Sequence, residues 1–139
     1  MSSRSLSDLS VPMAACAAEF EGQLIGQGIT FVRACTYRSS SEQDADYAQG
    51  RTAPGLIVTQ AKGGESRHND TCNGEPAADA ADYYPLRNGR LIGNKTGTEL
   101  ALWEKMGEIG EACGLEWGGR WPVRIRDMPH FQLRKATPP

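Results

Sequence analysis

The sequence has few large aliphatic residues and no long apolar run. Leu, Ile, Val and Phe together contribute 23 of 139 residues, about 17%, which is low for a globular protein. The formal net charge of only −2 argues against a disordered chain. No apolar run approaches the ~18 residues of a membrane-spanning helix, so we expect no membrane anchor. The hydrophobic core should be thin, and a bound metal would help to stabilise it.

The sequence also lacks a strong charge of one sign and a convincing export signal. Fifteen Lys and Arg residues stand against seventeen Asp and Glu, and no basic block could follow a phosphate backbone, so nucleic acid is not an expected partner. The N-terminal Ala-rich run is preceded by Asp8 and followed by Glu19 and Glu21, which makes it a poor secretory signal. We therefore expect synthesis and residence in a cytoplasm.

Paired cysteines are missing as well. The four cysteines are Cys16, Cys35, Cys72 and Cys113. No C-x-x-C pair suggests a zinc knuckle or a redox site. We expect free, mostly buried thiols in a reducing compartment.

Local patterns predict a mixture of helices and short strands. The predicted helices cover residues 11–27, a short segment from the capping-box pair Ser39 and Glu42 to about Gly50, and residues 98–113. The predicted strands cover residues 29–36, 56–59, 77–86 and 129–133, with a long turn-rich loop at 61–76. No βαβ unit repeats, so the fold class is α+β. The length predicts one domain over residues 1–139, with a core at about 10–133 and a flexible tail at 134–139.

Two histidines, His68 and His130, are the scarcest chemically useful residues, and each lies close to a carboxylate. A catalytic zinc needs three protein ligands of His or carboxylate type and an open fourth position, which two histidines and one aspartate would supply. The alternative is a solvated His68 in a polar loop and a partly buried His130 in a strand. Trp103 is expected in the core, whereas Trp117 and Trp121 suit either the core or a substrate-binding wall.

Six segments occur in an order that resembles a known family. They are TYRSSSEQ, YAQGRT, SRHN, A-x-D-Y, GLEWGGRW and DMPHFQL. The series is similar to the M15 family of zinc peptidases, and within it to the L-alanoyl-D-glutamate endopeptidase branch found in phage endolysins and bacterial cell-wall hydrolases. The resemblance runs from about residue 10 to residue 133. It implies a short, mostly antiparallel sheet with flanking helices, as in the Hedgehog and DD-peptidase fold.

The resemblance also implies a metal site with one zinc per chain. The S-x-H-N pattern makes His68 the first ligand, and A-x-D followed by an aromatic residue makes Asp82 the second. The D-x-P-H-F pattern gives His130 as the third ligand and Asp127 as the catalytic carboxylate. Zinc would activate water and polarise the scissile carbonyl, and Asp127 would carry the proton from the water to the leaving amine.

Substrate contacts are implied for five further positions. The Y-R-S pattern places Arg38 toward the substrate, where it would neutralise an oxyanion or hold a carboxylate. Arg51 in GRT is a second candidate for the carboxylate, and Ser66 would either orient its loop or bind substrate. Trp117 and Trp121 are candidates for a substrate wall.

Two features depart from the family pattern. His68 and Asp82 lie fourteen positions apart instead of the commoner seven, which we interpret as a loop insertion at 70–76. Asp79 also satisfies A-x-D but would point to the opposite face of a strand from Asp82, and Asp82 is preferred because the aromatic pair after it can pack. Arg120 stands where relatives often have an acidic residue, which puts the contacts near the tryptophans in doubt.

The function implied by the resemblance is hydrolysis of the L-alanyl-D-glutamate bond in the peptidoglycan stem peptide. We expect a monomeric phage endolysin that is made in the host cytoplasm and acts on the cell wall after its release. One alternative is a D-alanyl-D-alanine carboxypeptidase, dipeptidase or D,D-endopeptidase on the same zinc site. The other is a catalytically silent cell-wall-binding module that keeps the fold.

Overall fold

The computed structural model describes residues 2–93 and 95–134. Within them, a five-stranded antiparallel sheet has the order β1-β4-β7-β6, and β5 pairs with the end of β4. The strands are β1 (Phe31–Cys35), β4 (Ala80–Arg87), β5 (Arg90–Leu91), β6 (Leu115–Trp117) and β7 (His130–Leu133). A separate hairpin consists of β2 (Thr71–Cys72) and β3 (Glu75–Pro76).

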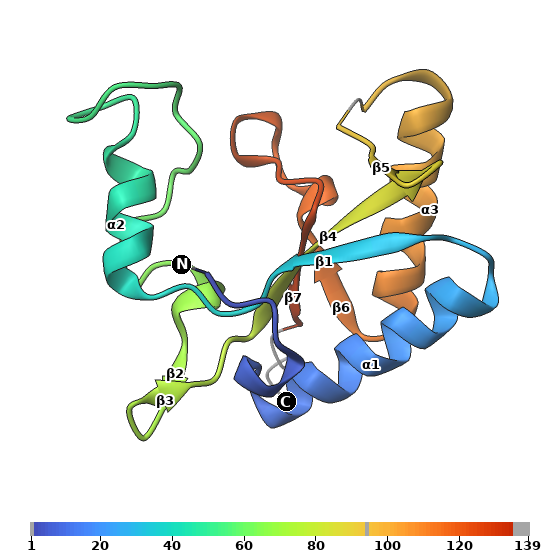
Figure 1. Cartoon of the computed structure of the whole chain (residues 1–139), viewed down its shortest axis with the longest axis horizontal. Helices are drawn as coiled ribbons and strands as arrows, with labels where there is room; N and C mark the ends of the chain where they lie inside the picture. The colour runs from blue at the N-terminus through green and yellow to red at the C-terminus, as the bar shows by residue number, and fades with distance from the viewer. Residues whose placement is uncertain (1, 94, 135–139) are drawn as a thin grey trace.

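The helices are divided between two sides of the molecule. They are α1 (Val11–Gly26), α2 (Ser40–Ala48) and α3 (Gly97–Ala112), with 3-10 turns η1 (Leu6–Asp8), η2 (Arg67–Asn69), η3 (Gly118–Arg120) and η4 (Val123–Ile125). Helices α1 and α3 pack on each other and on the sheet, whereas α2 stands at the far left of Figure 1. The loop after α2 and the loop between β6 and β7 both rise at the top of the same view.

Helix α1 buries one stripe of side chains against the sheet. Ser10 caps it by accepting a hydrogen bond from the backbone N–H of Met13. Met13, Ala17, Phe20 and Leu24 are fully buried, at the spacing of one helix face. The amphipathic pattern of the sequence therefore fixes which side of α1 faces the core.

Glycines in α3 let the core close around aromatic rings. A methyl group on Gly107 would lie 2.3 Å from the Trp117 ring, and one on Gly110 would lie 2.5 Å from the Phe131 ring. The two rings stack with centroids 6.5 Å apart. Aromatic rings packed directly on the α3 backbone thus fill core space that large aliphatic side chains occupy in other proteins.

The α+β prediction and the three predicted helices are confirmed, to within two residues at each long helix end. The predicted strand at 56–59 is wrong: the segment forms no strand, and Leu56, Ile57 and Val58 are exposed. The segment is held to the end of α2, where the side chain of Gln49 donates a hydrogen bond to the carbonyl of Leu56 at 2.9 Å. The extended segment at 77–86 starts its strand only at Ala80.

Ordered packing begins before the predicted core boundary at residue 10. Leu9 is 6% exposed and bridges to Ala78, and the backbone of Ser3 exchanges hydrogen bonds with Thr36 and Tyr37. The predicted tail at 134–139 lies outside the described residues except for Arg134. In the described part of the chain, no helix combines the length and apolar character needed to cross a bilayer.

Candidate metal centre

Strand register places three functional side chains in one row across the sheet. Cys35 in β1 is opposite Asp82 in β4, and Asp82 is opposite His130 in β7. Directly opposed residues in antiparallel strands share a face of the sheet, with Cβ atoms about 4.5–5.5 Å apart. The next residues along the strands, Tyr83 and Phe131, point to the other face and are buried in the core. The row therefore lies on the face away from the main core.

His68 reaches this row from η2, outside the sheet. The Ser66 hydroxyl caps the turn by accepting from the His68 backbone N–H at 3.2 Å, and the Asn69 amide oxygen accepts from the Ser66 N–H at 3.2 Å. The His68 carbonyl accepts from the Arg38 N–H at 2.9 Å. His68 is consequently only 2% exposed. Ser66 orients the loop, as one of its two predicted roles requires, and also lines the cleft.

Asp82 lies between the two histidines, and each of them is close to the same carboxylate oxygen. His68 Nε2 lies 3.1 Å from Asp82 Oδ1, His130 Nδ1 lies 3.5 Å from the same oxygen, and the two ring centroids are 5.0 Å apart. Tetrahedral ligands about 2.0–2.1 Å from a zinc ion are separated by about 3.3 Å. Two groups of donor atoms lie close enough together to share an ion, Cys35–His68–Asp82 and Asp82–Asp127–His130, and Asp82 belongs to both. The donor types of the two histidines and Asp82 therefore suit a catalytic zinc, with Asp82 between the histidines.

Neighbouring acceptors orient both imidazole rings. His68 Nδ1 lies 2.7 Å from the carbonyl oxygen of Thr36, so it donates there and leaves Nε2 toward Asp82. His130 Nε2 lies 2.9 Å from the amide oxygen of Gln132, so it donates there and leaves Nδ1 free. Metal-binding histidines commonly donate their second N–H in this way, which fixes the tautomer.

The buried charges stabilise one another. Burial alone lowers the pKa of His68, but the Asp82 carboxylate outweighs it and raises this pKa to about 10. Burial raises the pKa of Asp82, and the charges and hydrogen bonds of His68 and His130 overcome this and hold it well below its ordinary value. A buried carboxylate that is held ionised beside two imidazoles is suited to share a metal cation with them.

Asp127 lies at the mouth of the site. Its Oδ2 is 3.9 Å from His130 Nδ1, and its side chain is 48% exposed. The Asp127 N–H donates to the Gly118 carbonyl, and a methyl group on Gly118 would lie 2.3 Å from the Asp127 carbonyl oxygen. Burial, followed by the negative charge of Asp82, raises the pKa of Asp127. A carboxyl group with this environment is suited to accept a proton from a reacting water.

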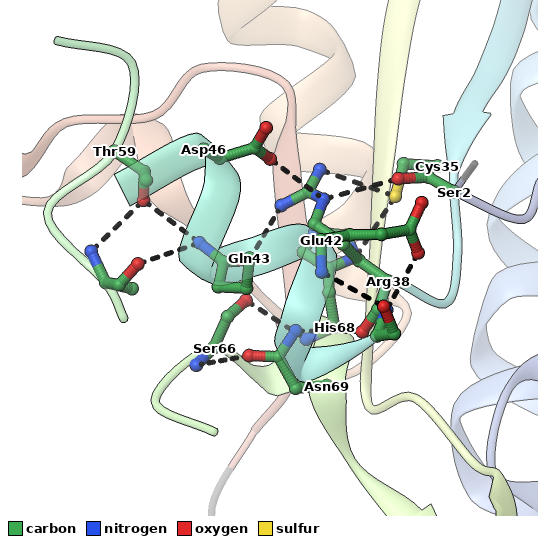
Figure 2. A network of polar contacts seen from close by, with 12 residues as sticks. Ser2, Cys35, Arg38, Glu42, Gln43, Asp46, Thr59, Ser66, His68 and Asn69 are labelled. Carbon is green, nitrogen blue, oxygen red and sulfur yellow. Dashed lines mark hydrogen bonds and ion pairs between the residues drawn. The ribbon is translucent and has the colours of Figure 1, made fainter. Parts of the chain in front are cut away.

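Arg38 is held at the side of the site by several polar groups (Figure 2). Its guanidinium donates to the Gln43 amide oxygen at 3.0 Å and to Cys35 Sγ at 3.5 Å, and it lies 3.4 Å from Asp46 and 3.8 Å from Asp82. Gln43 is 1% exposed and donates in turn to the Ala61 carbonyl at 2.9 Å. Arg38 therefore has a fixed position close to Asp82.

The predicted tryptophans have different places. The Trp117 ring is 2% exposed, and its N–H donates to the Met128 carbonyl at 2.7 Å, so this residue belongs to the core. The Trp121 ring lies 5.0 Å from the His130 ring and lines the cleft, and its N–H donates to Glu116 at 2.8 Å. Only Trp121 is placed to contact a substrate.

The structure does not bring two other candidates to the site. The Arg51 guanidinium donates to the carbonyls of Tyr47 and Thr59 and does not line the cleft. Asp79, the alternative to Asp82, lies 3.5 Å from Arg67 and accepts from the Ser10 hydroxyl.

Sequence reasoning missed the polar residues that support the site. Cys35 touches His68 Nδ1 at 3.7 Å, although Cys72, exposed in β2, had been the cysteine closest to the ligands in sequence. Gln132 could have been found from its place two residues after His130, on the same face of a strand. Nothing in the sequence singles out Gln43 or the carbonyl of Thr36.

The metal-side residues form the floor of a cleft of about 760 Å³. Its walls come from α2 and the segment after it, from η2, from β4 and from the loop between β6 and β7. Segments far apart in the sequence thus enclose one site that is open to solvent.

Comparisons with known proteins agree with this geometry. A family model described as D-alanyl-D-alanine carboxypeptidase, of the M15 peptidases, matches residues 59–133. The chain is 39% identical over 107 residues to the peptidoglycan L-alanyl-D-glutamate endopeptidase CwlK of Bacillus subtilis (strain 168), covering 77% of this chain and 62% of that protein. The chain thus spans less than two thirds of the relative's length.

The fold matches that of a solved structure. The crystal structure of the Serratia marcescens L-Ala D-Glu endopeptidase ChiX superposes with a TM-score of 0.62 at 17% identity, covering 96% of this chain and 89% of that one. The family model covers more than half of the chain and includes His68, Asp82, Asp127 and His130. The chain therefore belongs to the M15 peptidase family.

Proposed function

We propose that this chain is a zinc-dependent peptidoglycan hydrolase that cuts the stem peptide between L-alanine and D-glutamate. The observation that carries the proposal is the placement of His68 Nε2 and His130 Nδ1 beside the same oxygen of Asp82 in an open cleft, with Asp127 near His130. The similarity to CwlK supports the choice of bond.

The three converging residues would hold the metal, and Asp127 would handle the proton. A zinc ion in this position supplies a Lewis acid that lowers the pKa of a water molecule and polarises the scissile carbonyl. Asp127 accepts the proton of the attacking water and delivers it to the leaving amine. Its raised pKa makes the Asp127 carboxylate a stronger base toward the attacking water, and a pKa nearer to the working pH makes both protonation states accessible for the two transfers.

Arg38 and Trp121 would bind the peptide next to the metal. Gln43 and Asp46 hold the Arg38 guanidinium in place, so it can stabilise a developing negative charge without moving. Trp121 presents its ring as an apolar wall beside His130. The substrate would therefore lie between α2 and the loop that precedes β7.

A second candidate function follows from the description of the family model. A D-alanyl-D-alanine carboxypeptidase would use the same ligands and the same proton carrier on the other end of the stem peptide. The two activities differ in their products: the first releases the stem from the sugar-linked L-alanine, and the second releases terminal D-alanine.

Digestion of defined muropeptides, followed by mass spectrometry and zinc analysis, tests the proposal. We expect the stem to be released at D-glutamate by protein that contains about one zinc, and release of terminal D-alanine would establish the second candidate. His68→Ala and His130→Ala should lose both zinc and activity. Asp127→Asn should keep zinc and lose ~10²–10⁴-fold in kcat, since an amide cannot accept the proton. Wall binding without any cleavage would indicate the silent binding module.

The biological setting is a finer part of the proposal. We propose a monomeric phage endolysin that reaches the cell wall from the host cytoplasm at lysis, on the basis of the family resemblance. Expression in a host together with a membrane-permeabilising protein should lyse the cells, and Asp127→Asn should not.

A further inference from the structure

Two loops above the cleft contain basic and aliphatic residues but no acidic residue. They are the segments 50–62, after α2, and 118–126, between β6 and β7. Their basic residues are Arg51, Lys62, Arg120, Arg124 and Arg126. The whole chain has a net charge of −2, so positive charge is concentrated on the loops that rise at the top of Figure 1.

Two of these basic side chains have a structural task elsewhere, and two others line the cleft. Arg51 holds its own loop, and Arg120 forms an ion pair with Glu111 at 3.0 Å and does not line the cleft. Arg124 and Arg126 do line the cleft, and among the described residues neither pairs with a carboxylate. The Arg126 Nε donates to the Trp121 carbonyl at 3.1 Å. This hydrogen bond holds the Arg126 side chain against its own loop, beside the candidate site.

Exposed aliphatic side chains accompany the two arginines. Ile57 and Val58 on one wall and Ile125 on the other line the cleft while 52%, 59% and 43% exposed. The carboxylates Asp82, on the floor, and Asp127, at the mouth of the site, also line the cleft. The cleft is therefore acidic beside the histidines. Asp46, which pairs with Arg38, and Glu65 line the side of α2 and the segment after it, and basic and apolar side chains lie together on the loop between β6 and β7.

A stem peptide has the complementary distribution of groups. The L-alanine side of the scissile bond continues to the sugar through amide bonds, whereas D-glutamate brings a carboxylate that is not part of the peptide chain. Arg38 is already engaged by Asp46 and Gln43 and faces Asp82. A second cation is needed to pair with the substrate carboxylate, and a guanidinium offers a fork that binds it in two hydrogen bonds.

We propose that Arg124 and Arg126 form a subsite that binds the free carboxylate on the D-glutamate side of the scissile bond, with Ile57, Val58 and Ile125 packing on the adjoining aliphatic groups. This proposal rests on the proposed endopeptidase function and deepens it. The subsite fixes the direction of the stem peptide: its anionic part lies under the β6–β7 loop, and its sugar-linked end leaves on the opposite side.

The test compares two stem tripeptides, L-Ala–D-Glu–diamino acid with a free D-glutamate carboxylate and the same peptide with that group amidated. The double variant Arg124→Gln/Arg126→Gln should lower kcat/KM for the free acid ~10–100-fold, mostly through KM, because charge-assisted hydrogen bonds are lost. It should change kcat/KM for the amide less than about threefold. Arg120→Gln, on the same loop but paired with Glu111, is the matched control and should affect neither peptide.

Binding measurements and charge-conserving variants test the arginine subsite separately from the proposed endopeptidase activity. Calorimetric titration of both peptides into the Asp127→Asn protein should show the same dependence on Arg124 and Arg126. If the wild type cuts another bond but binding still depends on the arginines and the free carboxylate, the endopeptidase assignment fails and the subsite stands. Arg124→Lys/Arg126→Lys keeps the charge and should recover part of the affinity for the acid.

Three results would overturn the proposal. The first is an equal loss for acid and amide, and the second is the same loss in Arg120→Gln. The third is binding to vesicles of anionic but not neutral phospholipid that requires the two arginines, together with peptide binding that does not require them. The loops would then contact a membrane surface.

Discussion

Gly107→Ala tests whether the folded core requires direct contact between the α3 backbone and the Trp117 ring. The added methyl group would lie 2.3 Å from the Trp117 ring, whereas ordinary contacts begin at 3.4 Å. The indole would have to retreat by about 1 Å, although it is 2% exposed, stacks on Phe131 and donates to the Met128 carbonyl. Neither neighbour leaves room for this movement.

The expected cost is about 1–3 kcal/mol. Overpacking a core costs ~1–3 kcal/mol, and weakening the Trp117 hydrogen bond costs ~1 kcal/mol. Replacing a helical glycine by alanine returns ~1 kcal/mol. At roughly 4 °C per kcal/mol for a domain of this size, the melting temperature should fall by ~4–12 °C. Because Met128 precedes the His130 ligand by two residues, zinc affinity should fall as well.

Urea unfolding followed by circular dichroism measures the change. The matched control is Gly22→Ala in α1, where the new methyl group meets nothing within 4 Å; it should raise stability by ~0.5–1 kcal/mol. The same substitution thus has opposite expected signs at the two sites. A Gly107→Ala protein as stable as the wild type would refute the close packing of α3 on Trp117.

Four further outcomes concern the metal site. Asp82→Ala should abolish zinc binding while Asp79→Ala leaves activity within a few fold, and the opposite ranking would show that Asp79 is the ligand. Cys35→Ser should keep about one zinc, because His68 Nδ1, the nitrogen next to the thiol, already donates to the Thr36 carbonyl. Loss of zinc in this variant would make the Cys35 thiol a ligand. Cys72→Ser is the control at an exposed cysteine. Gln43→Ala should lower kcat/KM at least tenfold with zinc retained, since the arginine it holds would lose its position; unchanged kcat/KM would show that this bond is not needed. Chelation should lower the melting temperature, and an unchanged value would mean that the metal does not support the fold.

The choice between the two candidate aspartates was predictable where strand parity decides which one lies beside the histidines. Asp79 and Asp82 differ by an odd number of positions, so only one of them can face the histidines, and the structure places Asp82 there. The capping box of Ser39 and Glu42 likewise located the start of α2. In both cases a short local pattern is sufficient, because the geometry is set within a few residues.

Contacts between distant segments were not predictable. The hydrogen bond between His68 and the Thr36 carbonyl joins two loops, and Arg51, predicted to bind substrate, instead stabilises its own loop. The apolar run at 56–59 has the composition of a strand but no neighbouring strand to pair with. Such outcomes depend on which segments the fold brings together, and a single sequence carries little information about this.

The hairpin of β2 and β3 lies between His68 and Asp82 in the sequence, so its length does not set the distance between these two side chains in space. The Ala77 N–H donates to the Asp70 carbonyl and closes the base of the hairpin, while Asn73 and Gly74 turn at its tip with positive φ angles. We expect residues added between Asp70 and Ala77 to leave the end of η2 and the start of β4 in place. The tip between Asn73 and Gly74 should therefore accept an inserted tag or small domain, and a sequence search for this metal site should leave the interval between its first two ligands free to vary.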